Sequence, residues 1–312
     1  MAHQPQLDPL LRRRSLPAGA ETFYRSMRDG WPVRAVRWPG EGTILLVTGR
    51  GDFIEKYAET IHDLVDAGWG VAAFDWRGQG LSRRLGLTPH HGASPGFAVW
   101  LNDLADLIAW AGAGTPVNVI AHSMGGHLVL RHLAAGGGGI ARAVVLAPMT
   151  GLIAKPLGPG ITAHVARCQS RRGHGGDYVW GGGPYQAGQP GERRQAVLTR
   201  SAERYDDERW WVGQQPALAL GSVTWGWLND AFASIAELTA PGVPEAISVP
   251  TLVLIPEQDA LVDSAATRRL AARIPSSQIA EYAGAGHELL REVSDCRASI
   301  VIRIRDFFEQ PV

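Results

Sequence analysis

Short, largely apolar runs that alternate with segments of helical spacing constrain the fold of this chain more than any other sequence feature. The apolar runs, which we expect to be strands, cover residues 33–38, 43–48, 70–75, 117–122, 142–147, 251–255 and 278–282. The segments with helical spacing cover residues 53–67, 98–111, 125–135, 265–274 and part of 288–308. Strands without a polar face must be covered on both sides, and strands joined through helices run parallel. The pattern therefore predicts the α/β class, with a mostly parallel central sheet and helices on both faces.

The alternation is interrupted once, after residue 150. Residues 151–248 are rich in glycine, proline, arginine and aromatic residues, and regular strands are hard to find in them. An irregular stretch of this length between two strands of one sheet indicates an inserted cap, or lid, domain and not a loop. We therefore divide the 312 residues into an N-terminal part of the core (1–150), a cap (151–248) and a C-terminal part of the core (249–312).

The charge and the N-terminus exclude several classes of protein. The 30 Lys and Arg residues balance the 30 Asp and Glu residues, so the chain lacks the basic surplus of a nucleic-acid-binding protein. No apolar run approaches the ~20 residues that span a bilayer, and the N-terminus lacks the hydrophobic segment of a secretory signal. We expect a cytoplasmic protein. Arg12, Arg13 and Arg14 fit a solvated tail better than a lipid contact, and peripheral contact with the inner membrane stays open.

Neither the cysteines nor the histidines indicate a metal site. Cys168 and Cys296 are too few for a disulfide framework and lack the spacing of metal ligands. The histidines do not recur at metal-ligand spacing either. We therefore expect no bound metal.

The strongest local motif is the sequence VIAHSMGG at residues 119–126, where a predicted strand runs into a predicted helix. Ala121 and Gly125 flank Ser123 at two positions on either side, which matches the nucleophile elbow G-x-S-x-G with alanine in place of the first glycine. The sharp turn crowds the flanking positions, so they require small residues. It also places the serine at a helix N-terminus, where free N–H groups favour developing negative charge. Ser123 is therefore the candidate nucleophile.

A serine hydroxyl needs a base to take its proton, and the base needs an acid to orient it. His287 is the candidate base, because it lies in a loop between the last predicted strand and the last helix. Asp259 is the candidate acid, because it follows strand 251–255 at the edge of the sheet where sites of α/β proteins gather. Asp263 is the alternative acid, although its position before a helix suits an N-cap.

Five segments together resemble the α/β-hydrolase superfamily and, within it, the bacterial lysophospholipase and monoacylglycerol lipase group. They are residues 48–57 (TGRGDFIEKY), 74–82 (FDWRGQGLS), 121–126, 258–263 and 286–287. The resemblance implies that Ser123 is the nucleophile, His287 the general base and then acid, and Asp259 the orienting carboxylate. It further implies an oxyanion hole formed by the backbone N–H groups of Met124 and Arg50, and no organic cofactor.

The chain departs from the pattern of the group at two positions. Related lipases usually have His-Gly where this chain has Thr48-Gly49, so we expect the oxyanion loop to be supported differently. Ala121 adds a methyl group where glycine is usual. Asp75, Arg77 and Ser82 of the second segment fit a structural role in a loop better than a catalytic one.

Two features bear on the substrate, and each has two interpretations. The aromatic side chains of the cap either line a pocket for an acyl or aryl group or pack the insertion onto the core; they are Tyr178, Trp180, Tyr185, Tyr205, Trp210, Trp211, Trp225, Trp227 and Phe232. Arg167, Arg171 and Arg172 either meet a phosphate head group or form a solvated face.

The predicted function is a serine hydrolase that cleaves carboxylic esters through an acyl-enzyme, of the lysophospholipase or monoacylglycerol lipase type. Its partner would be a small-molecule ester or lysolipid, and the oligomeric state is not predicted. One alternative is a serine peptidase similar to proline iminopeptidases. The other is a catalytically silent, ligand-binding protein with the same fold.

Overall fold

A computed structural model describes residues 8–86, 88, 90–186, 192–257 and 259–310, and its centre is a single β-sheet. Within these residues the sheet has eight strands in the order β1-β2-β4-β3-β5-β6-β7-β8. Strands β3 to β8 run parallel, whereas β1 pairs with β2 and β2 with β4 in antiparallel fashion. The bounds are β1 Glu21–Ser26, β2 Pro32–Trp38, β3 Glu41–Val47, β4 Trp69–Phe74, β5 Val117–His122, β6 Ile140–Leu146, β7 Thr251–Pro256 and β8 Ser277–Tyr282. The predicted α/β class and mostly parallel sheet are confirmed.

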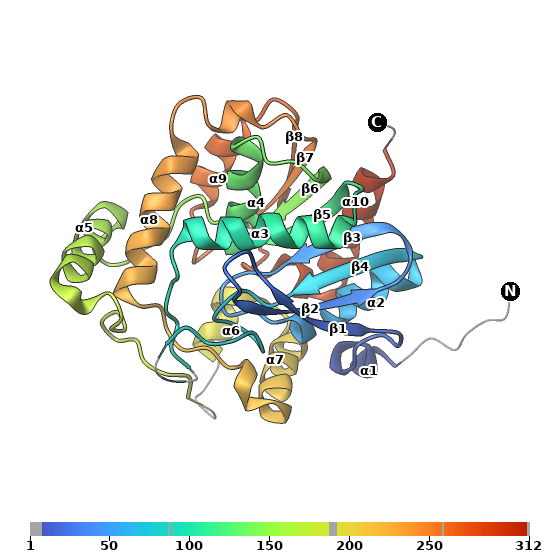
Figure 1. Cartoon of the computed structure of the whole chain (residues 1–312), viewed down its shortest axis with the longest axis horizontal. Helices are drawn as coiled ribbons and strands as arrows, with labels where there is room; N and C mark the ends of the chain where they lie inside the picture. The colour runs from blue at the N-terminus through green and yellow to red at the C-terminus, as the bar shows by residue number, and fades with distance from the viewer. Residues whose placement is uncertain (1–7, 87, 89, 187–191, 258, 311–312) are drawn as a thin grey trace, which may run out of the picture.

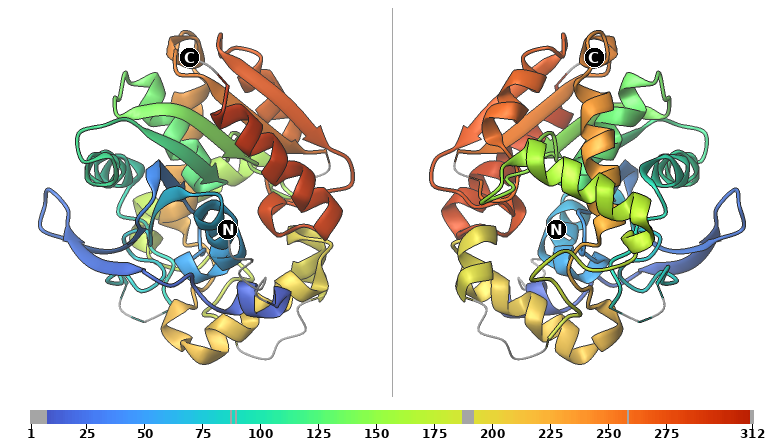
Figure 2. Two further views of the ribbon diagram at one scale, coloured as in Figure 1. Left: turned by 90° about the vertical axis from the view of Figure 1, so that its right-hand side faces the viewer. Right: turned by 90° about the vertical axis from the view of Figure 1, so that its left-hand side faces the viewer.

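Helices cover both faces of the sheet, as Figures 1 and 2 show. Successive side chains of a strand point to opposite faces, so Leu45 and Val47 of β3 belong to one hydrophobic core and Ile44 and Leu46 to the other. The first core is completed by α3 (Phe97–Gly112), α4 (Met124–Ala134) and α9 (Ser264–Ala271). The second is completed by η1 (Ile54–Tyr57), α2 (Ala58–Asp66) and α10 (Ser294–Phe308). Because both faces are buried at the middle of the sheet, the central strands carry largely apolar residues, whereas β1 and β8 at its edges are partly exposed and carry more polar ones.

The segment predicted to be an irregular cap is largely helical, which corrects that prediction. It contains α5 (Pro159–Gln169), α6 (Glu192–Leu198), α7 (Ala202–Gln214) and α8 (Trp225–Thr239). Side-chain caps start two of these helices: the Ser201 hydroxyl accepts the Arg204 N–H, and the Thr224 hydroxyl accepts the Trp227 N–H. Glycine- and proline-rich connections separate the helices and mask their short periodic patterns. Leu238 and Ile247 belong to segment 151–248 but are buried in the first core, so this segment shares a hydrophobic core with the rest of the chain. The division into segments 1–150, 151–248 and 249–312 therefore stays a prediction.

The three N-terminal arginines are not a solvated tail, because they join a short helix, α1 (Pro9–Arg14), to two other helices. Arg13 and Arg14 both pair with Asp207 of α7, at 2.6 and 2.7 Å. Arg12 pairs with Asp63 and Asp66 of α2. The prediction failed because the acidic partners lie far away along the chain.

None of the helices in the described ranges combines the length and the apolar character that crossing a bilayer requires.

Two isoleucines on α10 test the packing of the second core. Ile300 is fully buried, whereas half of Ile302 is exposed. Ile300→Ala should lower the free energy of unfolding by about 2–5 kcal/mol because it leaves a cavity, and Ile302→Ala should change it by less than about 1 kcal/mol. Urea unfolding followed by tryptophan fluorescence measures both values. Equal losses in the two variants would contradict the observed orientation of α10.

Candidate active site

Ser123 lies at the sharp turn between β5 and α4, with a backbone conformation that amino acids other than glycine rarely adopt. Its φ and ψ angles are 52° and −115°. A Cβ atom at Gly125 would lie 2.5 Å from the Thr48 carbonyl oxygen, so glycine is required there. Ala121 instead lies within β5, paired with Val47 and Val145 and fully buried, so its methyl group belongs to the core. The alanine is therefore accommodated away from the crowded side of the turn.

The structure brings together the three side chains predicted to form the triad. His287 lies with Nε2 2.9 Å from the Ser123 hydroxyl oxygen and Nδ1 2.5 Å from Oδ2 of Asp259. The other carboxylate oxygen of Asp259 accepts the N–H groups of Leu261 and Val262, at 2.7 and 3.0 Å. Ser123, Asp259 and His287 follow β5, β7 and β8, whose carboxyl ends share one edge of the parallel sheet. The arrangement can move a proton from the serine to the imidazole.

The acid and the base shift each other's protonation equilibria. Burial would raise the pKa of Asp259, but the charge and hydrogen bond of His287 and two backbone N–H groups hold this pKa below its usual value. Burial would lower the pKa of His287, but the charge and hydrogen bond of Asp259 raise this pKa above its ordinary value. The pair therefore favours a protonated imidazole once it has taken the serine proton.

Asp263, the alternative acid, is the N-cap of α9. Its Oδ1 accepts the N–H groups of Ala265 and Ala266 at 2.9 and 3.1 Å. The N-cap interpretation is confirmed, and Asp259 is the carboxylate that contacts His287.

The predicted oxyanion donors come from two segments that line the same cavity as Ser123. Met124 is the first residue of α4, and Arg50 follows β3. The flanking N–H groups are occupied, since Gly49 donates to Asp52 at 2.9 Å and Gly51 donates to Gln79 at 2.5 Å. The N–H groups of Arg50 and Met124 donate no hydrogen bond to any described residue. Two backbone donors are thus free for a developing oxyanion.

Asp52 is a candidate functional residue that the sequence analysis did not single out, because its carboxylate holds the predicted oxyanion loop. The residue is 3% exposed. Its Oδ2 accepts the Gly49 N–H and the Tyr57 hydroxyl and lies 3.1 Å from Nδ1 of His122, while its Oδ1 accepts Lys56 Nζ at 2.6 Å. His122 Nε2 lies 3.2 Å from the carbonyl oxygen of His287. Asp52 therefore links the oxyanion loop to the loop that carries the base.

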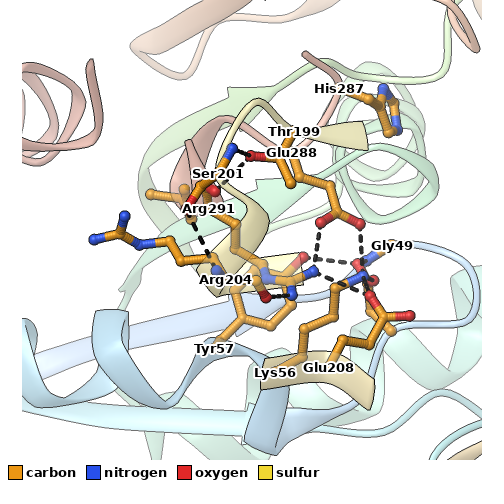
Figure 3. A network of polar contacts seen from close by, with 12 residues as sticks. Gly49, Lys56, Tyr57, Thr199, Ser201, Arg204, Glu208, His287, Glu288 and Arg291 are labelled. Atoms are coloured by element: carbon orange, nitrogen blue, oxygen red, sulfur yellow. Dashed lines mark hydrogen bonds and ion pairs between the residues drawn. The ribbon is translucent and has the colours of Figure 1, made fainter. Parts of the chain in front are cut away.

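Lys56 extends this link into a buried cluster of charges, which we call the Lys56 cluster (Lys56, Asp52, Glu208, Glu288 and Arg291). Figure 3 shows Lys56, Glu208, Glu288 and Arg291 side by side. Lys56 Nζ lies 2.6 Å from Asp52, 2.6 Å from Glu288 and 2.9 Å from Glu208. Arg291 of η5 (Leu289–Arg291) pairs with both glutamates. The Asp52-to-Lys56 spacing was visible in the sequence, but Glu208 and Arg291 are brought in only by the fold.

Ser123 and His287 open into a cavity of about 410 Å³. Apolar side chains from the core and from α8 line much of it, among them Met149, Leu152 and Trp227. A second cavity of about 560 Å³ lies beside it, lined in part by Tyr185, Tyr205 and the backbone of residues 181–183. A chain-like apolar group fits the first cavity.

The two interpretations of the cap aromatics both apply, to different residues. Trp227, Tyr185 and Tyr205 line cavities. Trp211 instead packs the segment against the N-terminal helix, since its indole N–H donates to the Arg13 carbonyl oxygen. Trp180, which is 67% exposed, fits neither interpretation.

Other predicted features have structural or solvated roles. Asp75 accepts Arg34 and the N–H groups of Ile54 and Leu81, which confirms its structural role. Arg77 likewise pairs with Asp29 and Asp103, and the Ser82 hydroxyl donates to the Asp75 carbonyl oxygen. Arg167, Arg171 and Arg172 are exposed, as the solvated interpretation expects. Among the described residues no cluster of His, Cys, Asp and Glu could hold a metal ion.

The sheet order, the serine at the turn after β5 and the histidine and aspartate after later strands define an α/β-hydrolase. The sequence pattern of the family described as serine aminopeptidase, S33, matches residues 39–294. The chain belongs to this hydrolase family.

Curated relatives match over most of both chains. Lysophospholipase L2 of Escherichia coli strain K12 is 29% identical over 304 residues, which cover 90% of this chain and 85% of the relative. A Haemophilus influenzae protein named "Probable lysophospholipase L2" is 29% identical over 273 residues, covering 85% and 82%.

Solved structures share the fold. A monoglyceride lipase from Saccharomyces cerevisiae superposes with a TM-score of 0.74 at 16% identity, covering 94% of this chain and 97% of that one. A monoacylglycerol lipase from Paleococcus ferrophilus gives a TM-score of 0.67 at 21% identity, covering 88% and 99%.

The contact between Asp259 and His287 predicts a specific pH dependence. Since the free imidazole must accept the serine proton and its pKa is raised, kcat/KM should increase with pH through a midpoint above ~6.5. Asp259→Asn removes the charge that raises this pKa, so the midpoint should move to lower pH. The same change should lower kcat on the order of 10³–10⁴-fold because the tautomer is no longer held. Ester hydrolysis measured between pH 5 and 9 tests both effects.

Asp263→Asn is the matched control. Asparagine is also a good N-cap, so the rate and the pH profile should stay unchanged. Loss of turnover in Asp263→Asn alone would overturn the assignment of the acid.

Asp52→Ala tests the support of the oxyanion loop. We expect kcat to fall about 10–100-fold with a smaller change in KM, because the Gly49 N–H loses its acceptor and the loop its fixed position. Asp66→Ala is the control, since that side chain is 60% exposed and, among the described residues, forms an ion pair with Arg12 alone. Steady-state kinetics on variants shown to be folded by circular dichroism would reveal the difference. Equal kcat values would show that the loop is held without Asp52.

Proposed function

We propose that this protein is a serine hydrolase that cleaves carboxylic esters through an acyl-enzyme, of the lysophospholipase or monoacylglycerol lipase type. The observation that carries the proposal is the continuous contact from the Ser123 hydroxyl through His287 to Asp259, at 2.9 and 2.5 Å. Such a chain of contacts is what a serine needs to become a nucleophile at neutral pH.

In the proposed reaction, the Ser123 oxygen attacks the ester carbonyl carbon as Nε2 of His287 takes its proton. The N–H groups of Met124 and Arg50 stabilise the oxyanion, and each such donor typically contributes on the order of 10²–10³ in rate. The tetrahedral intermediate collapses, the ester C–O bond breaks, and the leaving alcohol takes the proton from His287. A water molecule then gives a proton to His287 as its oxygen attacks the carbonyl carbon of the acyl-enzyme. The second tetrahedral intermediate collapses, the bond from this carbon to the Ser123 oxygen breaks, and His287 returns the proton to the serine as the acid is released.

Two observations support a monoacyl ester as the substrate. The apolar cavity at Ser123 suits an acyl chain, and the curated relatives are named lysophospholipases. A cytoplasmic location and any peripheral contact with the inner membrane stay predictions.

A serine aminopeptidase is the second candidate function, because the family description names that activity. Such an enzyme would need a free carboxylate near Ser123 to bind the substrate's amino group. Asp52 and Glu288, which line the cavity, both pair with Lys56. This pairing favours the esterase.

Hydrolysis of p-nitrophenyl esters of increasing chain length, compared with aminoacyl arylamides, tests the choice. We expect hydrolysis of medium- and long-chain esters and little turnover of the arylamides. Ser123→Ala should lower the rate by at least about 10³-fold and abolish labelling by a fluorophosphonate probe. Ser248→Ala, at an exposed serine, is the control and should leave both unchanged. Unlabelled wild-type protein without turnover would favour a ligand-binding role, and faster turnover of the arylamides would favour the peptidase.

A further inference from the structure

Arg50 lies where the two cavities adjoin. Its side chain lines both the catalytic cavity of about 410 Å³ and the neighbouring cavity of about 560 Å³. The backbone N–H of the same residue is one of the two predicted donors to the carbonyl oxygen of the substrate. A substrate that reacts at Ser123 and extends into the second cavity would therefore pass this guanidinium group.

The partners of the Arg50 guanidinium are neutral. Its Nη2 donates to the Gly221 carbonyl oxygen at 2.9 Å, and its central carbon lies 5.3 Å from the centroid of the Trp227 ring. Its Nε is buried and has no hydrogen-bond partner. The side chain pairs with no carboxylate among the residues that the structure describes.

The other cations around the two cavities do have carboxylate partners. Lys56 pairs with Asp52, Glu208 and Glu288, and Arg194 pairs with Glu208. Arg209, in the second cavity, pairs with Asp206. Among the described residues that line the two cavities, Arg50 is therefore the cation that has no carboxylate partner.

The Arg50 side chain is partly buried. A cation with reduced access to water and no carboxylate beside it is destabilised, and an anion bound there would relieve the cost. Burial lowers the pKa of Arg50 to about 10, so the group is still protonated at neutral pH. Glycine at position 92 leaves room for the guanidinium group, because a Cβ atom there would collide with Nη2 of Arg50. The position is thus built around a charged arginine.

We propose that Arg50 binds a phosphate group on the leaving-alcohol side of the ester. Guanidinium groups pair with phosphate oxygens through two parallel hydrogen bonds. The acyl chain would occupy the apolar cavity, and the glycerol phosphate would extend past Arg50 toward Tyr185 and Tyr205. The assignment rests on the proposed ester hydrolysis at Ser123, and it selects a phosphate-bearing lysophospholipid over an uncharged monoacylglycerol.

The first test compares two substrates with the same short acyl chain below their micelle concentrations, a lysophosphatidylglycerol and a monoacylglycerol. The ratio of their kcat/KM values should fall at least 10-fold in Arg50→Gln, mainly through KM of the charged substrate. Arg50→Lys keeps the charge and should retain part of the preference. Arg269→Gln, whose native side chain is 70% exposed, should retain all of it. An equal loss for both substrates in Arg50→Gln would overturn the proposal.

The second test uses only the wild-type protein and therefore does not depend on the folding of a variant. Glycerol 3-phosphate should compete with a p-nitrophenyl ester more strongly than inorganic phosphate does, because it carries the rest of the head group. Stronger competition by inorganic phosphate, or none by either, would overturn the assignment to a lipid head group. Fluorophosphonate labelling and monoacylglycerol hydrolysis in the same samples test the proposed esterase separately, so either proposal can fail alone.

Discussion

Lys56 lies among three buried carboxylates, and the geometry of the site depends on this arrangement of charges. Its amine contacts Asp52 beside the oxyanion loop, Glu288 beside the base, and Glu208 on α7. Removing one member of a buried ion pair leaves an uncompensated charge and typically costs about 3–5 kcal/mol. The three segments are therefore held in one relative position. That position places the free N–H of Arg50 and the imidazole of His287 around Ser123.

The parts of the molecule contribute differently to this site. The parallel sheet positions the three side chains of the proposed triad, because the carboxyl ends of β5, β7 and β8 lie at one edge. Helix α8 adds Trp227 to an apolar cavity over the serine, and α7 adds Glu208 to the Lys56 cluster. Helix α1 holds α7 through Arg13 and Arg14. An N-terminal segment far from the chemistry thus helps to place a charge near it.

The sequence predicted the sheet and its helices better than it predicted segment 151–248. Most strands of the sheet, the helices that cover it and the turn that carries Ser123 could be predicted, because periodicity and the elbow motif are local patterns. The helices of the residue 151–248 segment were not predicted, although α7 has 13 and α8 has 15 residues, because glycine- and proline-rich connections lie between them. Strand β1 was missed because its side chains are largely exposed. The arginines that stood out in the sequence, Arg167, Arg171 and Arg172, are exposed, whereas Arg50 lines both cavities.

The sequence by itself determined the α/β class, the strand–turn–helix around Ser123 and the identity of the candidate base. These follow from hydrophobic spacing and from the small residues that a sharp turn requires. Only the tertiary structure decided that Asp259 and not Asp263 contacts the base, that Asp52 supports the oxyanion loop, and that Arg50 lacks an anionic partner. The physical reason is that the electrostatic free energy of a charged side chain depends on the groups that lie near it in space, whatever their distance along the chain. Glu208 and Glu288 pair with Lys56 across more than 150 and 230 positions of the chain, and no local pattern in the sequence indicates either pair.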